Sequence, residues 1–281
     1  MVITGQIPEA EELQPAYDLV DVDYQILHTS RGCIRRCGFC GVYTIEPEWQ
    51  YKKTIAREVC KKKLIFYDNN LLANPFIEHI LRELISLRRH RKISYVESQS
   101  GFDGRLLIDN PEYARLLREA GFKNPRIAWD GGYDEREQIR EQIDILVGGG
   151  YRRKDISVFM IYNFRVGYEE MEYKRAYCFL LGVQVTDCRY RPLDSVCDGY
   201  NPRKRCQGGD EYFISDNWCD GEVRGFRRNV RRHNICVRTG SDFHSSLLER
   251  GKVDKRFYKC SFVDVVGVLD DVWCPGVPDI S

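Results

Sequence analysis

Short runs rich in β-branched and aromatic residues alternate with longer amphipathic stretches over the first two thirds of the chain. Such alternation is typical of strand–helix units built around a parallel sheet. We count about six units, and we therefore predict an α/β fold. The predicted strands span residues 24–29, 63–68, 92–98, 125–130, 156–164 and 183–190.

Helix signals lie between these strands. Asn74 and Pro75 suit a cap and a first helical position, and the apolar residues of segment 76–87 fall on one face. The same two residue types at 110 and 111, with Gly121 as a stop, delimit a second helix. Asp134 is the expected cap of a third helix, which ends at the glycines 148–150, and residues 168–181 form a fourth. Segment 44–62 is short and charged, so the first crossover is expected to be small or irregular.

The composition narrows the class of protein. The chain has 281 residues, a net charge of +1, 43% hydrophobic and 30% charged residues, which argues against disordered and collagen-like chains and against a simple polybasic nucleic-acid binder. Its first residues include acids and no apolar run, and no later stretch approaches the ~20 apolar residues of a membrane span. We therefore expect a cytoplasmic protein without membrane contact. Twelve cysteines in a reducing compartment point to metal ligation, catalysis or buried thiols before disulfides.

Three cysteines lie within eight residues directly after the first predicted strand: Cys33, Cys37 and Cys40. They can converge on one inorganic cluster if the intervening chain curls, which the glycines at 32, 38 and 41 permit. A cubane 4Fe–4S cluster needs four ligands, so three local thiolates leave one iron open to a non-protein ligand. The alternatives are a zinc site, for which His28 is the nearest further ligand, and three buried structural thiols.

This cysteine spacing, with Phe39 before the third cysteine and a strand before the loop, resembles the cluster-binding loop of the radical S-adenosylmethionine (radical SAM) superfamily. The resemblance implies a 4Fe–4S cluster on the three cysteines and S-adenosylmethionine (SAM) chelated at the open iron. It also implies reductive cleavage of SAM to a 5′-deoxyadenosyl radical that abstracts hydrogen from a substrate. A cellular electron donor such as flavodoxin or ferredoxin is the implied protein partner.

The resemblance also organises the domains. Residues 23–192 are expected to form a partial (β/α)6 TIM-like barrel, with residues 1–22 leading into it. Residues 193–281 are expected to form a Cys- and Arg-rich C-terminal extension that covers the barrel mouth. A six-unit barrel is incomplete, and by resemblance its open side admits a large substrate.

Ligands of parallel α/β sheets bind at the carboxyl ends of the strands, so the polar residues there are candidates for SAM contact. After the second strand the chain carries Asp-Asn-Asn where the superfamily commonly has a Gly-Gly-Glu-like stretch, a departure that puts the contact with the SAM amino group in doubt. Alternatively, Asp and Asn at such places only turn the chain or cap a helix. The cofactor-binding candidates are Phe39, Asp68, Asn69, Asn70, Glu97, Ser98, Gln99, Asp130 and Asn163.

The sixth predicted strand brings Cys188 and Tyr190 to the barrel mouth. A thiol or phenol at that place can donate a hydrogen atom to a substrate radical, so both residues are catalytic candidates. Ordinary packing is the alternative for each of them.

Segment 223–238 contains six arginines and no acid. If it is helical, Val223, Phe226 and Val230 form an apolar face beside a cationic one, and arginine forks suit phosphates. The Arg224–Arg238 patch is therefore a candidate contact for a phosphate-bearing substrate, with a solvated face as the alternative. Six further cysteines lack a CxxC pair and form either an auxiliary iron–sulfur site or separate buried thiols: Cys197, Cys206, Cys219, Cys236, Cys260 and Cys274.

The sequence leaves three functions open. The first is a radical SAM enzyme that acts on an unidentified substrate. The second is radical SAM modification of a nucleoside, nucleotide or RNA, which the arginine patch and its interleaved aromatic residues favour. The third is an iron–sulfur protein that transfers electrons or binds a partner without catalysis.

Overall fold

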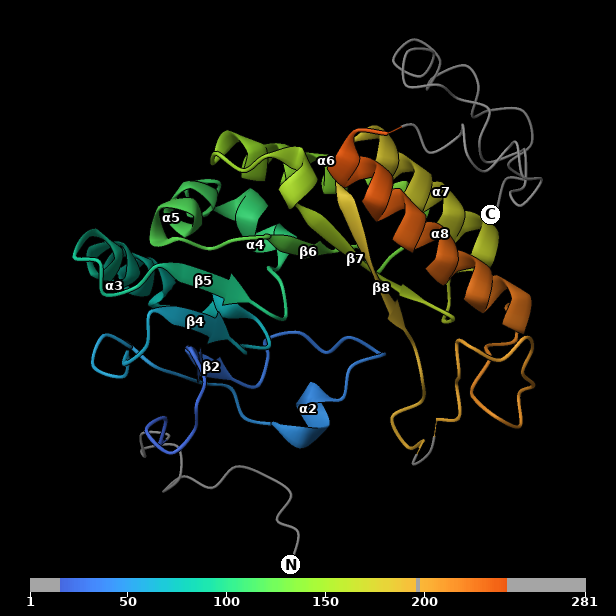
Figure 1. Ribbon diagram of the computed structural model, residues 1–281, viewed down its shortest axis with the longest axis horizontal. Helices are drawn as coiled ribbons and strands as arrows, with labels where there is room; N and C mark the ends of the chain where they lie inside the picture. The colour runs from blue at the N-terminus through green and yellow to red at the C-terminus, as the bar shows by residue number, and fades with distance from the viewer. Residues whose placement is uncertain (1–15, 196–197, 242–281) are drawn as a thin grey trace, which may run out of the picture.

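The computed structural model describes residues 16–195 and 198–241, and it has a mixed α/β fold with parallel sheets (Figure 1). All six predicted strands are present, and each is a few residues shorter than predicted. They are β1 (Tyr24–Leu27), β4 (Lys63–Phe66), β5 (Tyr95–Ser98), β6 (Arg126–Ala128), β7 (Ser157–Tyr162) and β8 (Gln184–Arg189). The β-branched and aromatic runs were therefore sufficient to locate the sheet.

The six strands follow one another in chain order. One parallel sheet has the order β1-β4-β5 and a second has the order β6-β7-β8. Phe102 bridges the two sheets, because it pairs with Ile127 and its amide donates to the Arg126 carbonyl at 2.6 Å. No strand pairing within the described residues joins β8 back to β1. The described sheets therefore form an open series of parallel strands, with helices along one side (Figure 1).

The helices predicted from apolar periodicity are also present. They are α3 (Ile77–Arg89), α5 (Glu112–Ala120), α6 (Arg136–Gly148) and α7 (Tyr168–Leu180). Gly121 ends α5 with φ 101°, a left-handed conformation that glycine adopts without strain. The prediction that Asp134 caps the third helix was wrong. A 3-10 turn, η2 (Tyr133–Glu135), contains Asp134, and α6 begins after it without a side-chain cap.

Short elements complete the connections. The first crossover is irregular, as predicted, and contains α2 (Val42–Ile45) and β3 (Gln50–Tyr51). The 3-10 turn η1 (Leu71–Ala73) follows β4. β3 pairs in antiparallel fashion with β2 (Ser30–Arg31). Two short elements were not predicted: α4 (Gly104–Asp109) and the 3-10 turn η3 (Arg153–Asp155).

The two faces of the strands differ in burial. Leu64 and Phe66 of β4 are fully buried toward the helices, as are Val158 and Met160 of β7. The opposite face is covered incompletely, because residues that alternate with the buried ones remain open: Ile26 of β1 is 43% exposed, and Ala128 of β6 is also exposed. The inner side of the sheets is therefore incompletely filled among the described residues.

The described part of the extension adds a last helix, α8 (Asp220–Thr239), which packs against β8 and α7. Val223, Phe226 and Val230 are buried on one face, as the spacing predicted. At its start the side chains of Cys219 and Glu222 form a reciprocal capping box. Residues 196–197 and 242–281 lie outside the described residues, so the predicted covering of the mouth stays a prediction. None of the described helices combines the length and the apolarity that a membrane crossing requires.

Candidate functional site

The three clustered cysteines lie in what we call the Cys loop, residues 32–41, which follows β1 and β2. All three thiols are free of disulfides and half-buried. The Cys40 amide donates to the Cys37 carbonyl at 3.0 Å, and the Arg35 amide donates to Cys33 Sγ at 3.3 Å. Burial raises the pKa of the Cys37 thiol, and Asp130, Cys40 and Cys33 add to that effect. The three thiols therefore lie within electrostatic reach of one another.

Gly32 turns the chain into the loop with φ 72°, and a Cβ there would lie 2.4 Å from the Glu48 carbonyl oxygen. This position therefore requires glycine. Gly38 has no positive φ, and a Cβ on it would lie 3.2 Å from Arg165 Nη2. Of the glycines expected to permit the curl, Gly32 supplies the unusual backbone conformation, and Gly38 allows a close neighbour.

Glu46 ties the Cys loop to the end of β4. Its Oε2 accepts hydrogen bonds from the Gly32 amide and from Asn69 Nδ2, both at 2.8 Å. Its Oε1 accepts from Arg31 Nη1 at 3.2 Å. The Asn69 side chain is therefore held by Glu46, and its predicted contact with SAM stays a prediction.

Asp68 fixes the segment that leads into the loop. It is fully buried, and its Oδ1 accepts from the amides of Thr29 and Ser30 at 2.9 and 2.7 Å. The hydroxyls of the same two residues donate to Oδ1 at 2.6 and 3.0 Å. Burial raises the pKa of Asp68 although these hydrogen bonds oppose the shift. Oδ2 is buried and has no hydrogen-bond partner among the described residues.

Asp103, the N-cap of α4, joins the loop to the end of β5. Its Oδ2 accepts from Arg35 Nε at 2.9 Å and from Asn70 Nδ2 at 3.1 Å, and its Oδ1 accepts from Arg105 Nε at 2.9 Å. Burial acts to raise the pKa of Asp103, but the bonds from Arg105, Arg35 and Asn70 outweigh it and lower the pKa. Asp103 is therefore a stable anion. Asn70 Oδ1 is buried, and no donor in the described part of the chain reaches it.

Aromatic contacts carry the Cys loop across to the other sheet. Phe39 meets Phe164 edge-on with 6.1 Å between ring centroids, and Phe164 lies 4.3 Å from the ring of Tyr190. The Arg165 guanidinium lies 5.3 Å from the centroid of the Phe164 ring. The loop therefore contacts residues that follow β5 and β7 directly, and it is connected to the end of β4 through Glu46, all at the carboxyl ends of the strands.

The three candidate residues at the end of β5, Glu97, Ser98 and Gln99, have different surroundings. Glu97 is buried, pairs with Arg126 of β6 and accepts from the Tyr95 hydroxyl. The carbonyl of buried Ser98 accepts from Arg126 Nη1 at 2.6 Å. The half-buried Gln99 side chain makes no hydrogen bond within the described residues. Arg126 thus links the two sheets through Glu97 and Ser98, and the SAM contacts of all three candidates stay predictions.

Asp130 lies directly beyond β6, and its carboxylate forms no hydrogen bond in the described part of the chain. Burial raises the pKa of Asp130, while Lys174 and Arg105 oppose the shift. Beyond the effect of burial, the charge of Asp130 raises the pKa of both Cys37 and Cys188. The Asp130 carboxylate therefore acts electrostatically on both the Cys loop and β8.

Lys174 of α7 holds the backbone on both sides of Asp130. The ammonium group is buried, and it donates to the carbonyls of Trp129 at 2.9 Å and Gly131 at 2.6 Å. It also lies 5.0 Å from the centroid of the Trp129 ring. Burial lowers the pKa of Lys174 to about 8, and Asp130 opposes the shift. The buried lysine fixes the direction in which the Asp130 side chain leaves the chain.

Both catalytic candidates lie on this side of the molecule. Cys188 is half-buried, and burial, with the charges of Asp187 and Asp130, raises its pKa to about 11. Its thiol is therefore protonated near neutral pH. Tyr190 contacts Phe164, which in turn contacts Phe39 of the Cys loop. The structure thus connects Tyr190 to the loop through Phe164, and the catalytic role of Cys188 stays a prediction.

Asn163 is engaged by the backbone. It is fully buried with φ 59° at the end of β7. Its Nδ2 donates to the Phe213 carbonyl at 2.9 Å and the Tyr190 carbonyl at 3.4 Å, and its Oδ1 accepts from the Ser215 amide at 2.9 Å. Asn163 therefore connects β7 to the extension, and its SAM contact stays a prediction.

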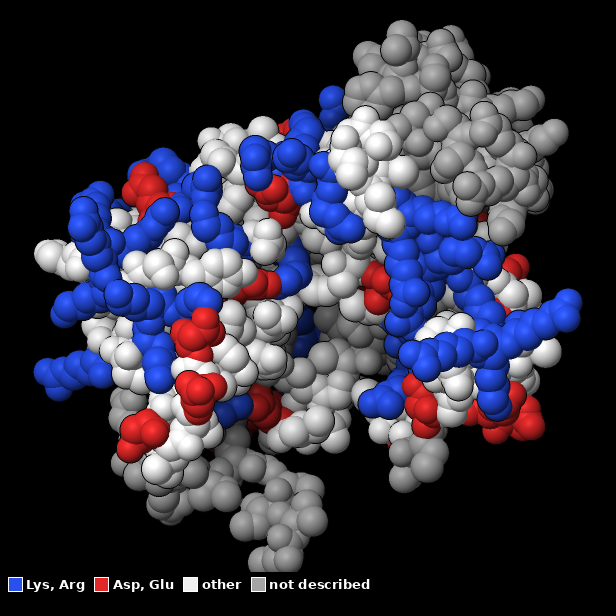
Figure 2. Space-filling view, viewed as in Figure 1, with Lys and Arg blue, Asp and Glu red and all other residues white. Residues whose placement is uncertain are grey.

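The Arg224–Arg238 patch on α8 is only partly available. Arg224 pairs with Asp220 at 2.8 Å and donates to the Lys204 carbonyl at 2.6 Å, and Arg227 lies 3.9 Å from Asp187. Exposed arginines give the cationic surface over α8 in Figure 2: Arg228, Arg231 and Arg238.

Of the six cysteines of the predicted auxiliary site, only three are among the described residues. Cys206 and Cys219 are exposed and Cys236 is half-buried, whereas the remaining members of the predicted auxiliary set lie outside the described residues: Cys197, Cys260 and Cys274. Within residues 16–195 and 198–241, no three His, Cys, Asp or Glu side chains are grouped as ligands of a metal ion. The auxiliary site stays a prediction.

Three charged residues of the site were not among the predicted candidates: Glu46, Asp103 and Lys174. Lys174 carried a signal, because it shares the buried face of α7 with Met171 and Cys178, where an apolar residue is the norm. Asp103 follows a strand and precedes a short helix, which is a pattern of capping. Glu46 carried no local signal.

Comparison with known proteins adds no support for the site. No protein-family model matches the sequence, and no curated protein matches it. The functional conclusion therefore depends on the residues and their geometry.

Proposed function

We propose that the chain is a radical SAM enzyme in which Cys33, Cys37 and Cys40 hold a 4Fe–4S cluster. One observation carries the proposal: the Cys loop is fixed to the ends of β4, β5 and β7 while its three thiols form no disulfide. Parallel α/β sheets bind ligands at this edge. The chain order of the six parallel strands, with helices outside them, supports a partial (β/α)6 barrel as the frame.

The donor set suits such a cluster. In a cubane each thiolate binds a different iron atom, so the three sulfurs lie farther apart than the ligands of a single ion. They therefore need not be grouped as they would be around one metal ion. Asp68 Oδ2 and Asn70 Oδ1 are acceptors beside the loop that lack donors in the described residues, which suits a ligand with amino and hydroxyl groups.

When bound, the cluster supplies the electron that cleaves SAM to methionine and a 5′-deoxyadenosyl radical, which abstracts hydrogen from the substrate. The chain itself orients the bound cofactor and shields it from water. The pair of Arg35 and Asp103 holds the loop at the end of β5. The Asp130 carboxylate has no partner among the described residues, and Lys174 holds the backbone on both sides of it. This carboxylate would accept hydrogen bonds from the cofactor. Cys188 retains its hydrogen because of its raised pKa, so it is able to donate a hydrogen atom to a substrate radical.

The open inner face of the strands supports a substrate of considerable size. Ile26 and Ala128 face this side and remain exposed. No other side chain of the described residues covers Ile26 or Ala128 on this face. The proposal does not assign the substrate class, and it takes flavodoxin or ferredoxin as the source of the electron.

Anaerobic reconstitution with iron and sulfide tests the ligand assignment. The wild-type chain is expected to retain about four irons, and Cys33→Ala, Cys37→Ala or Cys40→Ala is expected to remove most of them. Cys60→Ala replaces an exposed cysteine outside the loop, and it is expected to retain the wild-type iron content. Loop variants that keep their iron would refute the assignment, as would a Cys60 variant that loses iron equally.

A further inference from the structure

The edge of the sheets opposite the Cys loop, where the strands begin, is lined with basic residues. Each connection that leads into β4, β5, β6 or β7 carries at least one lysine. Parallel neighbours bring the starts of these strands side by side at intervals of about 5 Å. Within four residues of these strand starts, six basic residues outside the α-helices form no ion pair in the described part of the chain, and we call them the basic edge: Lys61, Lys62, Arg91, Lys92, Lys123 and Lys154.

The charges of the basic edge are not neutralised. Neighbouring cations have carboxylate partners: Lys63 pairs with Asp23, and Arg153 pairs with Asp144 at 2.5 Å. The six residues of the basic edge form no ion pair within the described residues, and each is exposed or half-buried. Figure 2 shows lysine and arginine side chains gathered over this side of the molecule, from α3 across α5 to α6.

Helix ends account for only some of the basic residues here. Cations near a helix C-terminus interact favourably with its carbonyl groups, and Arg88 of α3 donates to the Arg118 and Glu119 carbonyls at 3.2 and 2.8 Å. Lys92 and Lys123 lie beyond the helices, and their side chains form no such bonds within residues 16–195 and 198–241. Because like charges repel, placing them together does not stabilise the fold, and a bound anion would stabilise this arrangement.

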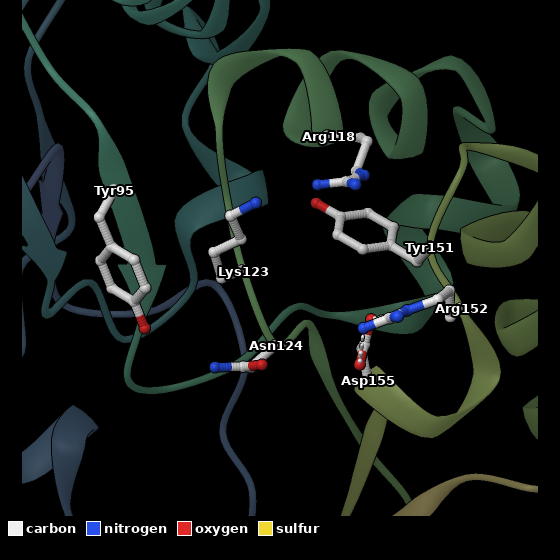
Figure 3. A pocket seen from close by; sticks show the side chains of 7 residues that line it. All are labelled: Tyr95, Arg118, Lys123, Asn124, Tyr151, Arg152 and Asp155. Carbon is white, nitrogen blue, oxygen red and sulfur yellow. Dashed lines mark hydrogen bonds and ion pairs between the residues drawn. The ribbon is translucent and has the colours of Figure 1, made fainter.

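A cavity of about 340 Å³ lies in the middle of this edge, between the starts of β5, β6 and β7 (Figure 3). The Lys123 amine and the Arg118 guanidinium turn toward each other there, and Arg118 Nε donates to the Gly150 carbonyl at 3.2 Å. Burial lowers the pKa of Lys123, and Arg118, Arg88 and Arg152 lower it further. Asp155, which lines the cavity and pairs with Arg152 at 2.7 Å, opposes the shift. An anion in this cavity would relieve that repulsion.

We propose that the basic edge binds the phosphodiester backbone of a nucleic acid, with one phosphate in the cavity beside Lys123. Unpaired cations spread over four connections exceed the charge of one small phosphate ligand, and they suit a polymer with a regular series of charges. Lysines, as flexible point charges, contact phosphates without reading bases, so binding is expected to depend on charge and salt. The proposal does not rest on the radical SAM function, because the Cys loop lies at the opposite ends of the strands.

Fluorescence anisotropy with the full chain, without SAM, tests this surface. The probes are labelled 20-nucleotide single-stranded RNA and DNA of one sequence, titrated at salt concentrations from 50 to 300 mM. Lys92→Gln/Lys123→Gln/Lys154→Gln is expected to weaken binding at least tenfold at 50 mM salt. Removal of three phosphate contacts is also expected to reduce the slope of log K against log salt by about 2.

A matched variant tests whether the loss of binding is specific to the basic edge. Arg228→Gln/Arg231→Gln/Arg238→Gln removes the same charge from α8, and we expect it to weaken binding less than threefold. Lys61→Gln/Lys62→Gln, outside the cavity, is expected to weaken binding several-fold, and thermal melting confirms that each variant is folded. Equal affinity for RNA and DNA indicates contact with phosphates alone, and tighter binding of RNA indicates added contact with 2′-hydroxyls.

Three results would overturn the proposal. One is no measurable binding of either oligonucleotide at 50 mM salt. Another is equal weakening by the α8 variant. The third is competition by polyglutamate as effective as competition by unlabelled RNA, which would assign the surface to an acidic protein.

Discussion

Arg35, in the middle of the Cys loop, donates a hydrogen bond of 2.9 Å to the carboxylate of Asp103, the N-cap of α4. The two residues are 68 positions apart in the chain. The Asp103 side chain is only 6% exposed, so the interaction is partly shielded from solvent screening. This pair links the predicted cluster ligands to the end of β5.

Asp103→Asn is expected to loosen the Cys loop, because an amide accepts a weaker hydrogen bond than a carboxylate from Arg35 and Arg105. We expect the variant to lose about 1–2 kcal/mol of unfolding free energy. The reconstituted cluster of the variant should bleach several-fold faster in air, as followed by its visible absorbance. Asp109→Asn, at the exposed end of the same helix, is the control, and equal bleaching of the two variants would contradict this role for Asp103.

Asp68 offers a second test of how the loop is held. Asp68→Ala leaves the buried amides of Thr29 and Ser30 without an acceptor, so we expect a loss of about 2–4 kcal/mol in the free energy of unfolding measured by urea denaturation. Asp68→Asn keeps an acceptor oxygen and is expected to cost less than half as much. If the two variants are equally unstable, the hydrogen bonds to Oδ1 are not the reason for this buried carboxylate.

Cys188 is expected to react slowly with alkylating reagents. Thiolates are the reactive form, and a pKa of about 11 leaves about 0.1% thiolate at pH 8. Peptide mass spectrometry after timed exposure to iodoacetamide should show Cys188 modified at least tenfold more slowly than the exposed Cys60. Rates within a factor of two would mean that Cys188 does not retain its proton in the way proposed.

His233 of α8 predicts a dependence of stability on pH. It is fully buried, its Nε2 lies 2.8 Å from the Val183 carbonyl oxygen, and burial lowers its pKa to about 3. Unfolded histidine takes up a proton near pH 6.5, whereas the folded residue stays neutral, so acidification below 6.5 favours the unfolded chain.

Between pH 7 and 5, this linkage is expected to remove about 2 kcal/mol of unfolding free energy. His233→Gln retains a donor for the Val183 carbonyl but cannot titrate. Urea denaturation at the two pH values should therefore show a decline about 2 kcal/mol smaller in the variant than in the wild type. The same decline in both proteins would mean that His233 is not the group responsible.

Local patterns were sufficient for the strands and for four of the helices, because apolar periodicity and turn residues act within one element. Segment 76–87 illustrates this, since its apolar residues became the buried face of α3. α4 escaped prediction because six residues are too few to display a periodicity. Asp134 failed as a cap because the 3-10 turn η2 comes between the strand and α6, and a sequence pattern does not distinguish these two starts.

The site was predictable only in part, for a related reason. The three cysteines and the polar strand ends are local signals, and the topology brings them to one edge. Glu46 acts through partners distant in the chain, so nothing beside it marks its role. The capping pattern at Asp103 is local, but it does not reveal the hydrogen bond from Arg35. Asn163 resembled a ligand residue because asparagine at a strand end suits both a ligand contact and a left-handed turn, and the structure gives it backbone partners.

The central claim is tested most directly by the cleavage of SAM. The anaerobically reconstituted and reduced chain is incubated with SAM, and 5′-deoxyadenosine and methionine are measured by chromatography with mass detection. We predict that both products form in equal amounts with the wild type and with Cys60→Ala. We also predict that neither forms with Cys33→Ala, Cys37→Ala or Cys40→Ala. A wild-type chain that carries about four irons and yields no 5′-deoxyadenosine under strict anaerobiosis would contradict the account.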